Sequence, residues 1–211
     1  HERERRIADR GDAAGAEHQR RHLGQLREQR IASRAARCIQ QGAQEDEDEE
    51  LPPVDTQVSA ELDWERRHRL MRTHSALHVL CGVVWRDHSA SVTGGNMEPL
   101  SGRMDFEFER MGGDLVDEIE AKVNEELRSA REVRVNVLPR EEAFAIPDLI
   151  RTKINLLPPG IDEIRTIEIV GLDLQADGGT HVRNTSEVGT IRVADYKSKG
   201  AINKRIYIEI E

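Results

Sequence analysis

The chain has 211 residues, enough for one substantial domain or two small ones with a real core. Aromatic residues make up only 3%, charged residues make up 34%, and the net charge is -9, so part of the length is expected to be solvated rather than packed. No apolar run approaches the roughly 18 residues of a membrane span, and no basic, apolar leader opens the chain. These features argue against a membrane-spanning protein and favour a cytoplasmic one.

Residues 1–50 differ sharply from the rest, because they contain ten arginines, no lysine and no aromatic residue. Such a segment cannot bury a core, so a solvated helix or a disordered arm is expected, and an arginine-rich arm that touches RNA is the alternative. The chain also begins without methionine, which suggests a fragment or an incorrectly assigned start. We predict two parts: an Arg-, Glu- and Gln-rich segment over 1–50, disordered or foreign to the native protein, and a folded domain over 51–211.

The predicted elements begin with a short strand over 55–63, followed by a helix from about Glu65 to Arg86 in which apolar residues recur at helical intervals. Next come two strands around a turn at Gly94–Gly95, an amphipathic helix over 112–130, a strand over 131–139 and a short helix that Pro147 limits. The last third predicts strands over 164–169, 190–196 and 205–210 around a glycine-bearing loop. This order favours an α+β fold in which an antiparallel sheet packs against two long helices.

Two short segments have the spacing of metal ligands: "THSALHV" contains His74 and His78, and "DGGTH" contains Asp177 and His181. Helical residues four apart lie on one face, about 6 Å apart along the axis, so both imidazoles can reach one zinc ion. In the second segment two glycines let the backbone fold so that both side chains point the same way. Three imidazole nitrogens and one carboxylate oxygen make an acceptable tetrahedral zinc site.

Each half alone also fits a structure without metal, because an HxxxH pair is often two hydrogen-bonded core histidines and "DGGTH" can be a capped turn. Cys81 continues the histidine stripe along the helix, and a core cysteine is the favoured interpretation. A zinc protease with an HExxH motif is excluded, because Ser75 stands where that motif needs glutamate.

Taken together, "THSALHV", "GLDLQADGGTHVRNTSEVG" and "KSKGAINKRIYIEI" resemble the editing domain of alanyl-tRNA synthetases and its freestanding AlaX-type relatives, over roughly residues 56–211. The resemblance implies the editing-domain fold of a class II aminoacyl-tRNA synthetase, one bound zinc ion and hydrolysis of serine, or glycine, mischarged onto the alanine tRNA. The partner would be the acceptor end of that tRNA and not DNA. Longer family members open with a barrel-like subdomain containing "GGGQ", which residues 1–50 do not match.

Residue by residue, the resemblance implies that His74, His78 and His181 bind zinc, and that Asp177 stands where the family usually has cysteine. It also implies that Thr93 distinguishes serine from alanine, and we expect its hydroxyl to donate a hydrogen bond to the serine side chain. The candidate surface for tRNA phosphates is the basic segment near the C-terminus, with a solvated hairpin as the alternative. Its cations are Lys197, Lys199, Lys204 and Arg205.

Two other functions stay open. In the first, zinc only ties the helix to the loop, and the protein binds RNA without chemistry. In the second, the chain is an inactive fragment, which the unmatched N-terminus and the Asp177 substitution would explain.

Overall fold

The structure is a computed structural model that describes residues 55, 57, 59, 61–152, 157 and 160–211. The chain divides into two units, residues 1–59 and 60–211, and nearly all described residues belong to the second unit. The predicted N-terminal segment 1–50 therefore lies outside the described residues. None of the helices in the described part of the chain is long and apolar enough to cross a bilayer.

The central element is the helix α2, Trp64–His88, which confirms the predicted helix and extends it at both ends. Asp63 is its N-cap: the Asp63 side chain accepts a hydrogen bond from the backbone N–H of Arg66 at 2.9 Å, which satisfies one of the free donors at the helix start. Its middle, from Ser75 to Val84, is buried without a break. A helix buried on all sides must have neighbours around its whole circumference, and two sheets and a second helix supply them.

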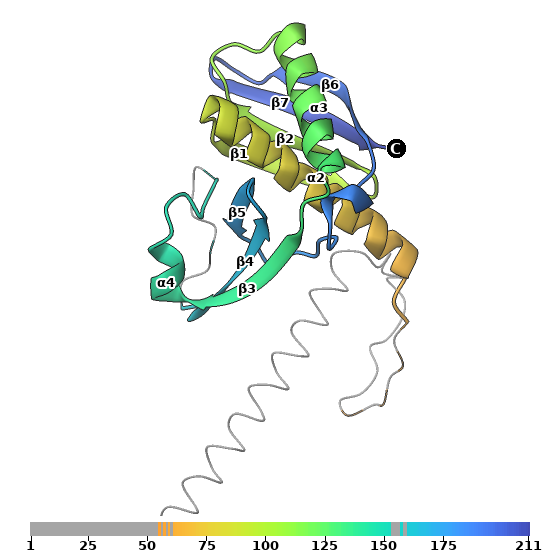
Figure 1. The fold of residues 1–211 in the computed structure, drawn as a ribbon, viewed down its shortest axis with the longest axis vertical. Coiled ribbons are helices and arrows are strands. Elements are labelled where there is room, and N and C mark those ends of the chain that lie inside the picture. The colour runs from red at the N-terminus through yellow and green to blue at the C-terminus, as the bar shows by residue number, and fades with distance from the viewer. Residues whose placement is uncertain (1–54, 56, 58, 60, 153–156, 158–159) are drawn as a thin grey trace, which may run out of the picture. The chain divides into compact units, whose positions relative to one another are not determined.

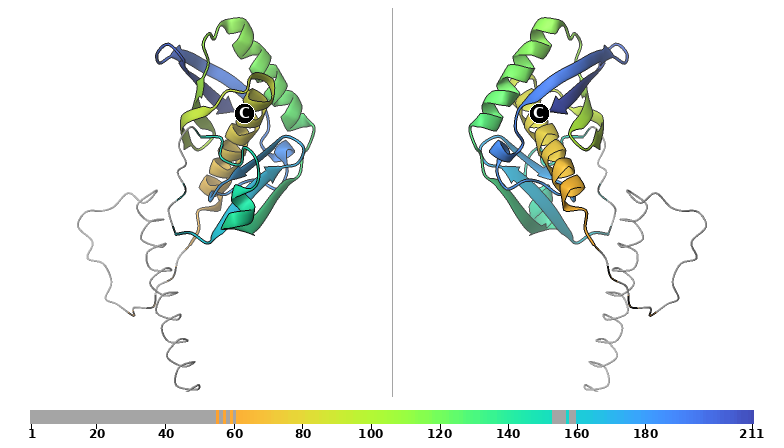
Figure 2. Two further views of the ribbon diagram at one scale, coloured as in Figure 1. Left: turned by 90° about the vertical axis from the view of Figure 1, so that its left-hand side faces the viewer. Right: turned by 90° about the vertical axis from the view of Figure 1, so that its right-hand side faces the viewer.

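A four-stranded antiparallel sheet has the order β1-β2-β7-β6. Its strands are β1 (Val92–Glu98), β2 (Ser101–Glu107), β6 (Ile191–Ser198) and β7 (Asn203–Ile210). The helices α2 and α3, Gly113–Arg128, lie together against one face of this sheet, as Figure 1 shows. In the side views of Figure 2, α3 lies on one side and the tip of the β6–β7 hairpin projects on the other.

A separate three-stranded antiparallel sheet has the order β3-β4-β5. Its strands are β3 (Val133–Pro139), β4 (Glu163–Ile169) and β5 (Asp173–Ala176), and the short helix α4 (Arg140–Phe144) and the 3-10 turn η1 (Thr185–Glu187) complete the described elements. The α2 helix passes close to β5: a Cβ on Gly82 would lie 3.0 Å from Cβ of Asp173, the first residue of that strand. The α+β fold class is confirmed, with its strands divided between two sheets rather than gathered in one.

Three local predictions are wrong. The two glycines predicted to turn lie inside β1, and the chain turns at Pro99–Leu100 instead, between the paired residues Glu98 and Ser101. The strand β5 was not predicted, and the described residues within 55–63 form no strand. Short or glycine-rich strands carry little periodic signal, so their pairing partners decide their conformation.

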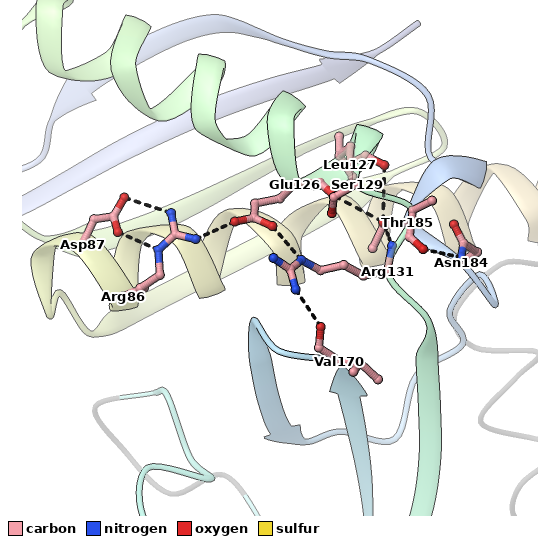
Figure 3. A network of polar contacts seen from close by, with 10 residues as sticks. Arg86, Asp87, Glu126, Leu127, Ser129, Arg131, Val170, Asn184 and Thr185 are labelled. Atoms are coloured by element: carbon pink, nitrogen blue, oxygen red, sulfur yellow. Dashed lines mark hydrogen bonds and ion pairs between the residues drawn. The ribbon is translucent and has the colours of Figure 1, made fainter.

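A network of charged and polar side chains ties the helices to the second sheet (Figure 3). The Glu126 carboxylate on α3 accepts hydrogen bonds from Arg86 of α2 and, at 2.6 Å, from Nε of Arg131, which precedes β3. Arg131 donates onward through Nη1 to the carbonyl of Val170 at 2.9 Å. Its backbone N–H also donates to the buried Thr185 hydroxyl at 2.9 Å. We call these residues, with Asp87 beside Arg86, the Glu126 network.

Candidate metal centre and adjoining cavity

The structure brings all four predicted metal ligands together. The α2 helix carries His74 and His78, and the loop after β5 carries Asp177 and His181. One ligand atom from each of the four lies within 4.8 Å of the others. The rings of His74 and His181 stack with centroids 4.1 Å apart, and His78 meets them edge-on at 5.0 and 4.6 Å. We call these four residues the His/Asp cluster.

The loop reaches the helix because its backbone folds tightly around the Asp177 carboxylate. Oδ2 of Asp177 accepts a hydrogen bond from the Gly179 N–H at 2.6 Å, and the Asp177 carbonyl accepts one from Nη1 of Arg165 at 2.8 Å. A Cβ at Gly179 would lie 2.6 Å from Nδ1 of His74, so no side chain fits there without a shift. The second glycine of "DGGTH" is therefore required by its close approach to His74.

His181 is oriented by Ser75, a buried residue one position after the first helical histidine. Nδ1 of His181 lies 3.2 Å from the Ser75 hydroxyl oxygen, which also accepts the backbone N–H of Val182 at 3.1 Å. When Nδ1 carries the ring proton and donates it to Ser75, the Nε2 lone pair faces Asp177 at 3.1 Å. That tautomer is the one a metal ligand needs. Sequence reasoning used Ser75 only to exclude a protease.

His78 has a corresponding partner in Asp173, whose side chain is fully buried on β5. Nδ1 of His78 lies 3.4 Å from Oδ2 of Asp173, and Gln175 donates to the same oxygen at 2.6 Å. Nε of Arg151 lies 3.4 Å from the other oxygen and compensates the buried charge. The alternation of Asp173 and Gln175 with two leucines in "LDLQ" is the signal that sequence reasoning missed.

Cys81 is confirmed as a core residue, 1% exposed.

Burial sets the protonation state of the cluster. Burial, together with the neighbouring His181 and His78, lowers the pKa of His74 to about 3. Burial also lowers the pKa of His181. For Asp177 burial raises the pKa, but the hydrogen bond with His181 and the surrounding imidazoles outweigh it, so the pKa lies well below its usual value.

At neutral pH the cluster therefore offers the neutral imidazoles of His74 and His181 and the carboxylate anion of Asp177, the forms in which these side chains bind metal. Three nitrogens and one oxygen form a donor set that could hold a metal ion, and the carboxylate makes the set harder than one with a thiolate.

A cavity of about 500 Å³ adjoins the cluster, and His78, Asp177 and Thr93 are among the residues that line it. Apolar side chains form much of the rest of its wall: Val92, Met104, Leu149 and Leu157. Thr93 is half-buried in β1, and its hydroxyl lies 2.9 Å from Oδ1 of Asn203. The predicted discriminating residue and two of the four predicted metal ligands, His78 and Asp177, thus line the same cavity.

The four predicted tRNA-binding cations have different surroundings. Lys199 is exposed, and Lys197 is exposed beside Asp195 at 2.8 Å. Arg205 forms two hydrogen bonds with the Asp105 carboxylate, at 2.6 and 2.7 Å. Lys204 is buried, and its ammonium group donates to the carbonyls of residues 200 and 201 at 2.7 and 2.8 Å. In this arrangement Lys204 holds the β6–β7 turn and presents no cation to the surface.

Comparison with known proteins gives the family. Residues 164–207 match the model of the threonyl and alanyl tRNA synthetase second additional domain. The chain is 37% identical to an alanyl-tRNA editing protein AlaX-M of Saccharolobus solfataricus over 158 residues, which cover 75% of this chain and 66% of the relative. It is 31% identical to the protein of the same name from Methanosarcina acetivorans over 171 residues, 76% of this chain and 70% of the relative.

An alanine–tRNA ligase of Methanococcus maripaludis is 37% identical over 139 residues, 64% of this chain but only 15% of the ligase. The chain spans about two thirds of the length of the AlaX-M relatives, at 66% and 70%. The long alignments with freestanding proteins, together with the domain match, show that this chain belongs to the AlaX-type alanyl-tRNA editing family.

Proposed function

We propose that this chain hydrolyses the ester bond of serine mischarged onto the alanine tRNA, and the corresponding glycine ester, using a zinc ion held by the His/Asp cluster. The observation that carries the proposal is the placement of this cluster on the wall of a cavity of about 500 Å³ that Thr93 also lines. A structural metal site needs no such cavity beside it, whereas a hydrolase must admit an aminoacyl ester. The names of the relatives support the same reaction class.

The metal, when bound, supplies Lewis-acid chemistry: polarisation of the ester carbonyl, a bound water with its pKa lowered toward about 7, and orientation of the substrate. The chain's own residues do the rest. Ser75 and Asp173 hold two of the ligating imidazoles in the required tautomer. The apolar wall surrounds the aminoacyl group and limits the access of water. Thr93 distinguishes an aminoacyl side chain that carries a hydroxyl from one that does not.

The tRNA would approach through its phosphates, in the cytoplasm where aminoacyl-tRNAs are used. Lys197 and Lys199 are the exposed lysines of the predicted set, whereas the charge of Arg205 is paired with Asp105. We expect Lys199→Ala to weaken tRNA binding and to make it less dependent on salt. Each phosphate contact that is lost lowers the slope of the logarithm of the binding constant against the logarithm of the salt concentration by about one. The folded part proposed to carry the function is 51–211, so a protein that lacks residues 1–50 should keep the activity.

The test is deacylation of seryl-tRNA for alanine by the purified protein, as isolated, after chelation and after zinc is restored. Alanyl-tRNA is the control ester, and the metal content is measured by mass spectrometry in each state. Hydrolysis of the seryl ester that disappears with the chelator and returns with zinc is the expected result. A folded, zinc-loaded protein that hydrolyses neither ester would refute the proposal.

A non-catalytic zinc module that binds tRNA is the second candidate, and the complete set of four protein donors favours it, since structural zinc sites are usually closed by four protein ligands. For this candidate, metal removal should unfold the domain, and the zinc-loaded protein should bind tRNA without turnover. Circular dichroism of the chelated protein and the deacylation assay separate the two functions.

A further inference from the structure

The backbone of β1 is irregular at Thr93. Val92 pairs with Phe106 of β2 and Gly94 pairs with the next residue of that strand, Asp105, so Thr93 is the extra residue of a β-bulge. A bulge re-aims a side chain relative to the regular alternation of a strand. Here the bulged residue lines the cavity next to the His/Asp cluster, and its hydroxyl is within reach of a polar side chain 110 residues later in the chain.

That side chain is Asn203, the first residue of β7. Its backbone is held on two sides, because it pairs with Glu107 of β2 and its carbonyl accepts the Lys199 N–H at 2.7 Å. Its side-chain oxygen Oδ1 lies 2.9 Å from the Thr93 hydroxyl oxygen. Asn203 is half-buried and does not itself line the cavity, so it acts on the cavity through Thr93.

This contact determines the direction of the Thr93 hydroxyl. An amide oxygen can only accept hydrogen bonds, and a hydroxyl has a single proton to donate. The Thr93 proton is therefore directed to Asn203, and the lone pairs of its oxygen remain for a group inside the cavity. The sequence-based expectation that Thr93 donates to the substrate is reversed: Thr93 accepts.

We propose that Asn203 is a positioning residue that sets Thr93 as a hydrogen-bond acceptor, so that the cavity selects aminoacyl groups that bring their own hydroxyl donor. This inference rests on the proposed deacylase function. A seryl group supplies the donor, whereas the methyl group of alanine and the hydrogen of glycine leave the Thr93 acceptor unmatched. Such a mismatch disfavours the alanyl ester and ranks the glycyl ester below the seryl ester, without any need for a steric barrier.

The experiment compares kcat/KM for seryl, glycyl and alanyl esters of the alanine tRNA in three variants of the zinc-loaded protein. Asn203→Leu removes the acceptor while nearly keeping the side-chain volume, and Asn203→Ala serves if the leucine variant does not fold. Asn203→Asp keeps an acceptor oxygen. We expect the ratio of the seryl rate to the glycyl rate to fall about tenfold in Asn203→Leu and to recover to within about threefold of the native value in Asn203→Asp.

A double variant with Thr93→Val tests the route of the effect. If Asn203 acts through Thr93, Asn203→Leu adds no further loss of seryl preference once the hydroxyl is gone. An equal fall for all three esters would show a merely structural role and overturn the inference, as would an unchanged ratio in Asn203→Leu. Failure of the native protein to hydrolyse any of the esters would instead refute the deacylase function itself.

Discussion

Two polar clusters lie along α2, and their charges are arranged in opposite ways. In the Glu126 network near the end of the helix, cations and carboxylates alternate: Asp87, Arg86, Glu126 and Arg131 follow one another by hydrogen bonds. In the His/Asp cluster near its middle, three imidazoles crowd around one carboxylate, with two rings stacked at 4.1 Å. The first arrangement is a continuous chain of short charged hydrogen bonds. In the second, three imidazoles surround one carboxylate, and Nη1 of Arg165 lies 3.7 Å from that carboxylate.

The charge of the neighbouring groups distinguishes a structural cluster from a functional one. In the Glu126 network the hydrogen bond from Arg86 holds the pKa of Asp87 well below its usual value, so the carboxylate is stabilised by a neighbour that is always charged. In the His/Asp cluster burial and the neighbouring imidazoles lower the pKa of His74 to about 3, which removes the proton that would otherwise pair with Asp177. Partly buried cations and carboxylates that neutralise each other stabilise the fold. Neutral imidazoles gathered around a carboxylate are instead electron-pair donors that can bind a metal ion.

The largest expected effect is on the His/Asp cluster. His78→Ala should lower seryl-tRNA deacylation and zinc affinity by at least about 100-fold, because changes to residues that merely orient metal ligands already cost about 10–100-fold. The matched control is His68→Ala on the same helix, where the imidazole stacks on Trp64 and faces no cluster partner. Metal content and deacylation rate are measured together. Retention of zinc by His78→Ala would remove this residue from the ligand set.

The second effect is on stability alone. Glu126→Gln breaks the charged hydrogen bonds to Arg86 and Arg131 and should lower the free energy of unfolding by about 2 kcal/mol, with zinc content unchanged. Urea unfolding measures the change. Glu118→Gln, which removes an exposed partner of Lys122, should leave the unfolding midpoint nearly unchanged. A loss of zinc in Glu126→Gln would show that the two clusters are coupled.

The same carboxylate should contribute to acid sensitivity. Burial raises the pKa of Glu126, but the hydrogen bonds from Arg131 and Arg86 lower it more, to below its ordinary value of 4.5. Because the folded pKa is lower than the unfolded one, this stabilisation is complete above about pH 4.5 and is lost as the pH falls through the folded value. The stability of Glu126→Gln should therefore fall less steeply than that of the native protein below this pH.

A smaller effect is expected at Ser75, which belongs to neither the ligands nor the Glu126 network. Ser75→Ala leaves Nδ1 of His181 and the Val182 N–H without their shared partner, so zinc affinity should fall about tenfold. Competition with a chromogenic chelator measures it. Thr73→Ala is the control, since this buried hydroxyl on the same helix contacts the carbonyl of Glu98 and no ligand. Equal zinc affinities in the two variants would rule out an orienting role for Ser75.

The smallest expected change is a gain. Asp177→Cys replaces a hard ligand with a thiolate and should tighten zinc binding several-fold while deacylation is kept. Chelator competition and the deacylation assay measure the two properties in the same preparation. Weaker zinc binding by the cysteine variant would mean that the carboxylate contacts to Gly179 and His181 matter more than ligand softness.

Much of the site could be predicted from sequence because its spacing is local. A four-residue interval on a helix places His74 and His78 on one face whatever surrounds them, and "DGGTH" contains the glycine that its close approach requires. The orienting residues could not be predicted. Asp173 and Ser75 act on ligands that come from other elements, and no periodicity in their own segments reveals those contacts.

By itself, then, the sequence determined the long helix with its histidine stripe, the second ligand pair in a loop, and the antiparallel α+β character, since each follows from short-range spacing. Only the tertiary structure decided that the strands form two sheets, that the paired glycines lie within a strand, and that Lys204 is buried while Lys199 is exposed. It alone joined Thr93 to Asn203 across 110 residues of chain. Strand pairing and side-chain burial depend on partners distant in sequence, and local chemistry does not specify which partner a residue meets.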